Sequence, residues 1–154
     1  SLAWMGRGHR FDVVADAMAR SRGRGLEICA QVILGLPGES REEMRATARE
    51  LARLEIASVK IHNLHALKGT RLTQMLEAGE VELPTLKEYV GYAVDFLEEL
   101  PPTCVIDRIS GDAPPQYLVG PAWCRNKQAV RAAIEAELRR RGTRQGCNSK
   151  PGGA

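Results

Sequence analysis

The chain has 154 residues, of which 44% are hydrophobic and 27% are charged, and this composition predicts one soluble globular domain. Aromatic residues make up only 5% of it, which argues against stacking platforms for single-stranded nucleic acid, and a net charge of +3 is too small to indicate a nucleic-acid partner by itself. No apolar run approaches the length of a membrane span and no secretory signal pattern opens the chain, so we expect a cytoplasmic protein without a membrane partner.

The four cysteines are far apart in the sequence and include no C-x-x-C pair. They are Cys29, Cys104, Cys124 and Cys147. In a cytoplasmic chain such cysteines are expected to be free thiols rather than disulfides, and their spacing does not predict a metal site.

The first half of the chain begins with a predicted helix and a predicted strand. Residues 11–22 carry an apolar stripe of helical period, and glycines at positions 23 and 25 end that helix. The strand that follows, up to residue 34, has one apolar and one more polar face. The apolar face holds Ile28, Ala30, Val32 and Leu34, and the other face holds Glu27, Cys29, Gln31 and Ile33.

A tight turn at residues 35–38 separates this strand from a helix predicted at residues 41–54. Ser40 and Glu43 have the spacing of a capping box at the start of that helix. Free backbone N–H groups and the helix dipole favour a polar or anionic ligand at such a turn. An ordinary turn that uses glycine for positive φ explains the same residues, and no lysine follows as it would in a Walker A loop. The spacing does not decide between the two interpretations.

A second strand is predicted at residues 57–64, with Val59 and Ile61 on one face and Lys60 and His62 on the other. The order strand–helix–strand requires a right-handed parallel crossover. The polar faces of both strands then lie on the same side of the sheet. That face lines either a barrel lumen or cleft, where a substrate would bind, or the solvated surface, and the sequence leaves both interpretations open.

The second half of the chain predicts three more helices, one more strand and a tail. They are a short helix to residue 78 capped by Thr70, a helix at 86–100 with Thr85 and Glu88 as a capping box, a strand at 105–109, a helix at 127–141 capped by Asn126, and a disordered tail at 147–154.

Polar side chains near the strand ends are the candidate binding groups. His62 beside Lys60 suits substrate binding or proton transfer, and a structural, hydrogen-bonded histidine stays equally open. A strand end and a turn bring together Asp107, Arg108 and Asp112, which suit the recognition of a substrate carboxylate or phosphate through Arg108. A structural salt bridge with Asx-type turn chemistry explains them as well. His62 and His65 face opposite ways on a continuous strand, so we expect no metal there.

Several motifs that follow one another in order resemble the YhcC-type radical S-adenosylmethionine (SAM) proteins. They are GRGH at 6–9, VILGLPGE at 32–39, KIHNLH at 60–65, LKGT at 67–70, RISGDAP at 108–114, PAW at 121–123, NKQ at 126–128 and QG at 145–146. The likeness covers about residues 2–146.

The resemblance implies an α/β fold: the C-terminal half of a partial (β/α) radical SAM barrel plus a small helical and strand C-terminal extension. It divides the chain into barrel residues 1–70, an extension at 71–146 and the tail at 147–154. Members of this family bind SAM at a [4Fe-4S] cluster and cleave it reductively to a 5′-deoxyadenosyl radical. The partners implied are an electron donor for the cluster and a small-molecule or tRNA substrate.

The family's cofactor contacts match the ends of the two predicted strands. The matching residues are Ile33, Gly35, Leu36, Pro37, His65, Leu67 and Lys68, and the substrate candidates are Gln31, Lys60, His62, Arg108 and Asp112. Gln31 departs from the family pattern, in which relatives often carry histidine. The resemblance assigns no role to the segment 108–112.

The three cysteines that hold the family's cluster lie in the first part of the barrel, and this chain has no such set. We therefore expect the chain to be the C-terminal portion of a radical SAM enzyme, inactive in SAM cleavage by itself. The alternative is a cluster-free α/β module that binds a nucleotide or phosphate at the turn from Gly35 to Ser40.

Overall fold

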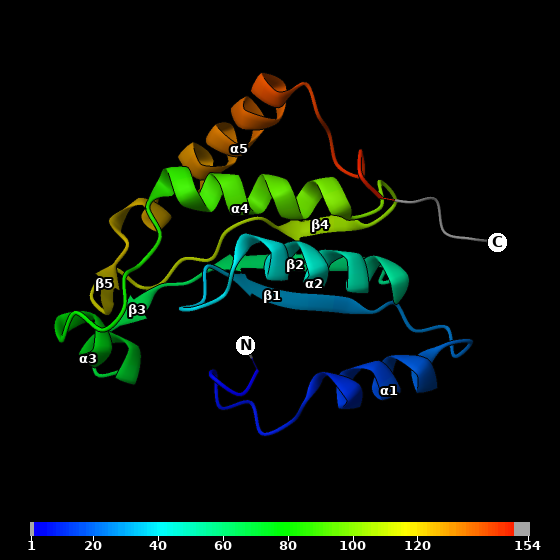
Figure 1. Cartoon of the computed structure of the whole chain (residues 1–154), viewed down its shortest axis with the longest axis horizontal. Helices are drawn as coiled ribbons and strands as arrows, with labels where there is room; N and C mark the ends of the chain where they lie inside the picture. The colour runs from blue at the N-terminus through cyan, green and yellow to red at the C-terminus, as the bar shows by residue number, and fades with distance from the viewer. Residues whose placement is uncertain (1, 150–154) are drawn as a thin grey trace.

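The computed structural model of the protein describes residues 2–149, which form α-helices and short β-strands joined by compact loops (Figure 1). The elements are α1 (Phe11–Ser21), β1 (Cys29–Leu34), α2 (Arg41–Arg53), β2 (Ser58–Asn63), β3 (Ala66–Leu67), α3 (Arg71–Glu77), α4 (Leu86–Glu99), β4 (Val105–Arg108), β5 (Leu118–Gly120), the 3₁₀ helix η1 (Ala122–Arg125) and α5 (Lys127–Arg141). Every helix and strand predicted from the sequence is confirmed, with ends that agree or differ by at most three residues.

The central sheet has three parallel strands in the order β1-β2-β4. Cys29 pairs with Ser58 at one end of β1, and Leu34 pairs with Asn63 at the other, so the two strands are in register over their whole length. The predicted parallel crossover through α2 is therefore confirmed. A second, two-stranded antiparallel sheet of β3 and β5 follows at the carboxyl ends of the parallel strands, and the sequence analysis missed it.

A bulge interrupts the pairing of β2 with β4. Val59 pairs with Ile106, but Lys60 pairs with Arg108, so Asp107 is an extra residue on β4. An extra residue bends the strand locally and redirects side chains that would otherwise alternate. As a result, Asp107 and Arg108 are consecutive and both exposed, and both contact side chains of the sheet's polar face.

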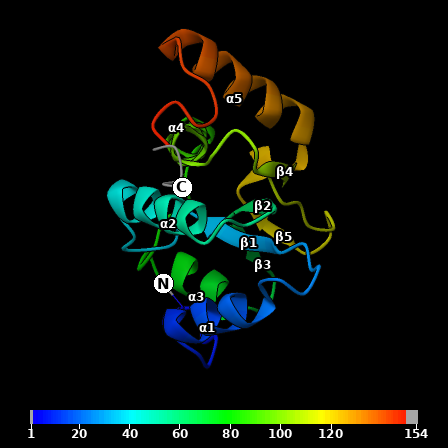
Figure 2. The ribbon, with the colours of Figure 1, turned by 90° about the vertical axis from the view of Figure 1, so that its right-hand side faces the viewer.

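One face of the parallel sheet packs against α2 and α4 and forms the core. Val59 and Ile61 of β2 are fully buried, and the predicted apolar residues of β1 contact the same cluster. Helix α4 packs on α2 and on α5. In Figures 1 and 2, α5 lies outermost beyond α4, and α1 and α3 lie at the opposite end of the molecule. The predicted alternation of apolar and polar residues in β1 and β2 is confirmed, because the apolar residues lie on the buried face and the others on the more exposed face.

Two capping boxes start the helices that cover the sheet. The Ser40 hydroxyl accepts from the Glu43 N–H at 3.2 Å, and the Glu43 carboxylate accepts from the Ser40 N–H at 2.7 Å. Thr85 and Glu88 repeat this arrangement at α4. Both boxes satisfy helix N–H groups that would lack partners, and both confirm the sequence prediction.

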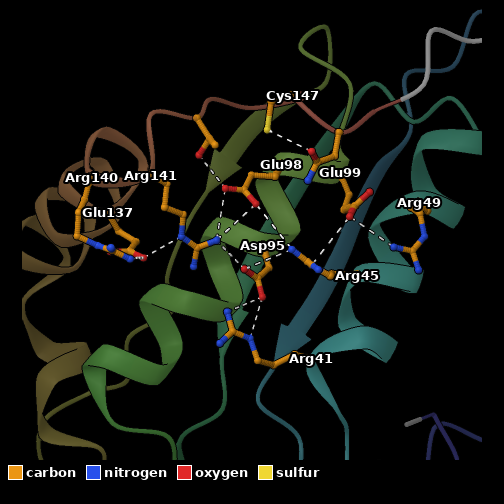
Figure 3. A network of polar contacts seen from close by, with 12 residues as sticks. Arg41, Arg45, Arg49, Asp95, Glu98, Glu99, Glu137, Arg140, Arg141 and Cys147 are labelled. Carbon is orange, nitrogen blue, oxygen red and sulfur yellow. Dashed lines mark hydrogen bonds and ion pairs between the residues drawn. The ribbon is translucent and has the colours of Figure 1, made fainter.

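Three carboxylates of α4 are buried where it meets α2 and α5 (Figure 3). They are Asp95, Glu98 and Glu99, and their partners are Arg41, Arg45, Arg49, Arg141 and Thr143. Because each carboxylate faces at least one guanidinium, the network compensates for the loss of hydration on burial. It joins the three helices through polar contacts at the back of the sheet.

The predicted extension continues the predicted barrel without a break in the core. Strand β4 completes the parallel sheet, and α4 covers it from the same side as α2. The core continues across residue 70, so the division of the chain into a barrel part and an extension at this residue stays a prediction. Of the predicted tail, residues 147–149 are hydrogen-bonded, with the Asn148 N–H donating to the Glu98 carbonyl at 2.9 Å, and residues 150–154 lie outside the described part. In the part that is described, no helix has the length and apolar character needed to cross a bilayer.

Candidate functional site

The polar face of the parallel sheet carries most of the predicted site residues. Its side chains come from three strands: Cys29, Gln31 and Ile33 of β1, Ser58, Lys60 and His62 of β2, and Asp107 and Arg108 of β4. They stand in rows because the strands are parallel and in register. The structure thus brings Gln31, Lys60, His62 and Arg108 together on one surface.

His62 is held in one orientation by Arg108 and by the segment after β4. The Arg108 Nη1 lies 3.2 Å from the His62 Nε2, and since a guanidinium only donates, Nε2 is the acceptor. On its other side the ring packs so closely on Gly111 that a Cβ at this glycine would overlap Nδ1. Burial lowers the pKa of His62 from its ordinary value, and the nearby Arg108 charge lowers it further. The arrangement favours a neutral imidazole.

A buried asparagine fixes the segment against which His62 packs. Asn63, only 1% exposed, accepts from the Gly111 N–H at 2.9 Å through its Oδ1. Asn63 was not among the predicted site residues, although the strand pattern carries a signal for it. The residue falls on the face of Val59 and Ile61, and a polar side chain on a buried face needs a specific partner.

Asp107 forms hydrogen bonds with the side chains at the amino ends of β1 and β2. Its Oδ2 accepts from the Ser58 hydroxyl at 2.8 Å and lies 3.3 Å from the Cys29 thiol. These bonds, that of Ser58 most strongly, lower the pKa of the Asp107 carboxyl. Spacing along the chain does not link Asp107 with Ser58 and Cys29, because their contact depends on the bulge in β4.

Asp112 is engaged outside this face. Its Oδ2 lies 2.8 Å from the Lys127 Nζ at the start of α5. Within residues 2–149 Arg108 makes no ion pair, and the structural salt bridge of this segment is the one between Asp112 and Lys127. Asp112 instead ties the loop after β4 to α5.

The predicted cofactor residues gather at the carboxyl ends of β1 and β2. Ile33, 37% exposed, is an apolar side chain on the polar face next to the turn. The Leu36 side chain is buried, so only its backbone is available to a ligand. The His65 Nδ1 lies 3.3 Å from the Asn63 carbonyl. The cofactor assignment of these residues stays a prediction.

Two further residues of the predicted cofactor set belong to the small antiparallel sheet. Leu67 pairs with Leu118, and the Lys68 N–H donates to the Tyr117 carbonyl at 2.9 Å. The Lys68 side chain itself is exposed. The segment that includes both residues is therefore held beside the end of β2 by backbone bonds.

Packing explains the glycine at position 35. Its φ is +85°, and a Cβ there would stand 3.0 Å from the Pro84 Cγ and 3.6 Å from the Tyr92 ring. The side on which a side chain would project therefore faces α4 and the residues before it. This observation favours a fold-determined turn over a turn shaped only for a ligand.

The helix N-terminus after this turn is already occupied. The Glu43 carboxylate accepts from both the N–H and the hydroxyl of Ser40, and the charge of Glu39 acts on it from nearby. Acidic side chains satisfy the N–H groups and repel another anion. The phosphate-binding alternative at residues 35–40 is thus disfavoured.

The cysteines are free and do not converge on a metal site. Cys104 and Cys124 are buried, and burial raises the pKa of both thiols, which opposes the thiolate form that iron–sulfur clusters require. Over residues 2–149 no group of three or more histidine, cysteine or acidic side chains is placed to hold a metal ion. The residues described here do not fit a [4Fe-4S] cluster.

The pKa of His62 is expected to move in opposite directions in two variants. Arg108→Gln should raise it, because a neighbouring positive charge is removed, and Asp112→Asn should lower it, because a negative charge is removed. NMR titration of the His62 ring in the wild type and both variants measures this.

The same lowered pKa predicts how stability depends on pH. Since the unfolded imidazole binds protons more readily than folded His62, the free energy of unfolding should fall as the pH drops from about 7 through the unfolded pKa of about 6.5. In Arg108→Gln this dependence should be weaker. Equal pKa values in all three proteins would show that the His62–Arg108 contact does not persist in solution.

Comparison with known proteins relates this fold to one family. Residues 56–140 match the family model described as the Radical_SAM C-terminal domain. The YtqA protein of Bacillus subtilis is 39% identical over 140 residues, which are 91% of this chain and 44% of YtqA. The YhcC protein of Escherichia coli K12 is 29% identical over 151 residues, which are 98% of this chain and 49% of YhcC.

A solved structure shares the fold. The archaeal Elp3 of Methanocaldococcus infernus, with an N-terminal deletion, superposes with a TM-score of 0.80 and 22% identity, over 94% of this chain and 34% of that protein. The predicted α/β fold class is confirmed by this match and by the parallel sheet. The chain spans less than half the length of the curated relatives YtqA and YhcC. On the match of the family model to more than half of its residues, the chain belongs to the radical SAM C-terminal domain family, and it resembles the C-terminal region of the YhcC-type proteins.

Proposed function

We propose that this chain is the C-terminal portion of a radical SAM enzyme and that the polar face of its sheet lines the site where SAM and substrate bind. One observation carries the proposal. In a chain of this family, the apolar side chain of Ile33 is exposed at the carboxyl end of β1, beside the turn and next to His62 on the polar face. An exposed apolar group at a strand's carboxyl end suits the flat face of an adenine ring.

The residues present fit the nucleoside part of SAM. The Ile33 side chain would cover the adenine, the backbone of residues 35–37 would border it, and His65, Leu67 and Lys68 would form the opposite wall. SAM, once bound and reduced by one electron from the cluster, would supply the 5′-deoxyadenosyl radical for hydrogen abstraction, with methionine as the other product. The side chains of this face would orient the substrate, and His62, whose Nε2 accepts from Arg108 and whose Nδ1 packs on Gly111, would fix the direction of the Arg108 guanidinium.

The cluster requires residues beyond this chain, because the cysteines described above do not fit it. A longer polypeptide would supply them, which agrees with the share of the curated relatives that this chain covers. The proposed enzyme also needs an electron donor and a small-molecule or tRNA substrate, and it would act in the cytoplasm.

Reductive SAM cleavage by the product of the complete reading frame that includes this chain tests the proposal. The protein is reconstituted anaerobically with iron and sulfide, and 5′-deoxyadenosine is measured, with this chain alone as the control. We expect bound iron and product only with cluster cysteines present, because this chain cannot hold the cluster. A reconstituted long form without iron and without product would overturn the proposal.

A variant of Ile33 tests the part played by this chain. In the long form, Ile33→Ala should weaken SAM binding by about tenfold, since it removes apolar area worth about 1.4 kcal/mol or more. Val105→Ala is the matched control, because Val105 is also exposed but lies at the amino end of β4. Equal SAM affinities of the two variants would contradict the adenine assignment.

A further inference from the structure

Two cations stand side by side on the polar face of the sheet. Lys60 of β2 and Arg108 of β4 are register partners on neighbouring parallel strands, and Gln31 of β1 is the partner of Lys60 on its other side. Adjacent strands lie about 4.8 Å apart. The row therefore presents an ammonium, a guanidinium and an amide to the same space, all of which donate hydrogen bonds.

The carboxylates near this row are engaged with other groups. Asp107 accepts from Ser58 and Cys29 in the row below, and Asp112 pairs with Lys127. In the described part of the chain neither Lys60 nor Arg108 has a carboxylate within ion-pair distance. Among residues 2–149, the side chain of Arg108 bonds to His62 alone, and the pKa of His62 is lowered, which favours the neutral imidazole. Both cations thus lie outside any ion pair in the described residues, and the charges of Asp107 and Asp112 act on Lys60 and Arg108 only at longer range.

Like charges on directly opposed positions destabilise a sheet. Such an arrangement is explained when an anion binds between the two charges and compensates them. We propose that Lys60 and Arg108, with the Gln31 amide as a further donor, form the binding site for an anionic group of the substrate, a carboxylate or a phosphate. This assignment rests on the proposed function, because that function makes the polar face the wall of the substrate site.

A second group of cations on the other side of the sheet is the competing anion site. A groove of about 850 Å³ between α2, α4 and α5 is lined by Arg41, Lys87, Arg140 and Arg141. Its arginines are paired, Arg41 and Arg141 with Asp95 and Arg140 with Glu137. Lys87 is exposed and in the described residues has no carboxylate partner, so Lys87→Met is the matched control for Lys60→Met.

Thermal unfolding of this chain with inorganic phosphate or acetate tests the proposal without SAM or a cluster. Without phosphate and at low salt, Lys60→Met should unfold at a higher temperature than the wild type, because one of two repelling charges is gone. Phosphate at constant ionic strength should raise the wild-type Tm saturably, and acetate should do so less, because it carries one charge. Lys60→Met and Arg108→Gln should weaken the apparent phosphate affinity by about fivefold or more, and Lys87→Met by less than about twofold.

Backbone NMR during the same titration locates the phosphate. The amide signals of residues 31, 60 and 108 should shift together with one dissociation constant. An unchanged phosphate response in Lys60→Met would overturn the proposal, and so would a response lost in Lys87→Met, which would place the anion in the helix groove. A lower Tm of Lys60→Met without phosphate would also overturn it, because the two charges would then not repel.

The methionine carboxylate of SAM is the other source of an anion at this row. Equilibrium binding of SAM to the long form distinguishes an anionic group of the substrate from the carboxylate of SAM. We expect Lys60→Met to reduce phosphate affinity more than SAM affinity. A larger loss of SAM affinity would show that the pair binds the cofactor and would overturn the substrate assignment. Because phosphate binding is measured on this chain alone, failure of SAM cleavage and failure of the anion site give different results.

Discussion

Asp95→Asn is expected to lower the free energy of unfolding by about 3 kcal/mol, because removing one partner of a buried ion pair leaves uncompensated charges. The Asp95 side chain is 5% exposed and accepts from Arg41 at 2.6 Å and from Arg141 at 2.7 Å. Asparagine keeps one acceptor oxygen but carries no charge, so one of the two guanidinium groups loses its acceptor and both lose the countercharge. At about 2–4 °C per kcal/mol for a domain of this size, the Tm should fall by about 6–12 °C.

The size of this effect depends on the position of Asp95 at the junction of three helices (Figure 3). Arg41 reaches it from the first turn of α2, and Arg141 from the last turn of α5. Loss of the carboxylate thus loosens α2 and α5 from α4 at the same time. Glu98 still faces Arg141, at 3.4 Å, which keeps the expected cost near the lower end for buried pairs.

Asp16→Asn is the matched control for Asp95→Asn. Asp16 pairs with Arg20 at 3.6 Å on the surface of α1, and its side chain is 67% exposed. Exposed pairs of this kind contribute less than about 1 kcal/mol. Chemical denaturation of both variants measures the difference. If both cost the same, the α4 carboxylates are hydrated in solution and the network does not hold the helices.

The buried carboxylates also show where sequence reasoning stops. The helical stripe of α4 predicted its apolar contacts, because period and burial coincide there. Asp95, Glu98 and Glu99 lie on the same helix and are equally buried, since arginines from α2 and α5 meet them. Those partners are about 50 residues away in the chain, and local spacing carries no information about such a distance. The capping boxes were predicted well for the opposite reason, since both partners lie within three residues.

The residues of the polar face could be predicted from the sequence, but the contacts between their side chains could not. Alternation in two strands placed Gln31, Lys60 and His62 on one face, and the parallel register confirmed it. The position of Arg108 next to Lys60 depends on the bulge in β4, which moves the register by one residue. Strands β3 and β5 were missed because segments of two or three residues show no period.

Gly35→Ala is expected to lower the free energy of unfolding by about 3 kcal/mol, of which about 1–2 arise from the positive φ and the rest from overpacking. The φ of +85° disfavours any side chain, and the new Cβ would stand 3.0 Å from the Pro84 Cγ. Pro84 cannot easily move, because it is buried and its carbonyl accepts from the Trp123 Nε1 at 3.0 Å. The turn would have to shift, and Ile33 at the end of β1 would shift with it.

Gly38→Ala is the control that separates the two costs. Gly38 lies in the same turn with a φ of +76°, but a Cβ there meets nothing within 4 Å. It should therefore lose only the conformational part, about 1–2 kcal/mol. Urea unfolding of both variants gives the difference, which we expect to be about 1–2 kcal/mol. Equal losses would mean that Pro84 yields and that the glycine is required for its backbone angle alone. In that case the turn at the end of β1 would be free to adapt to a ligand, and a Gly35 variant would report on cofactor binding rather than on the fold.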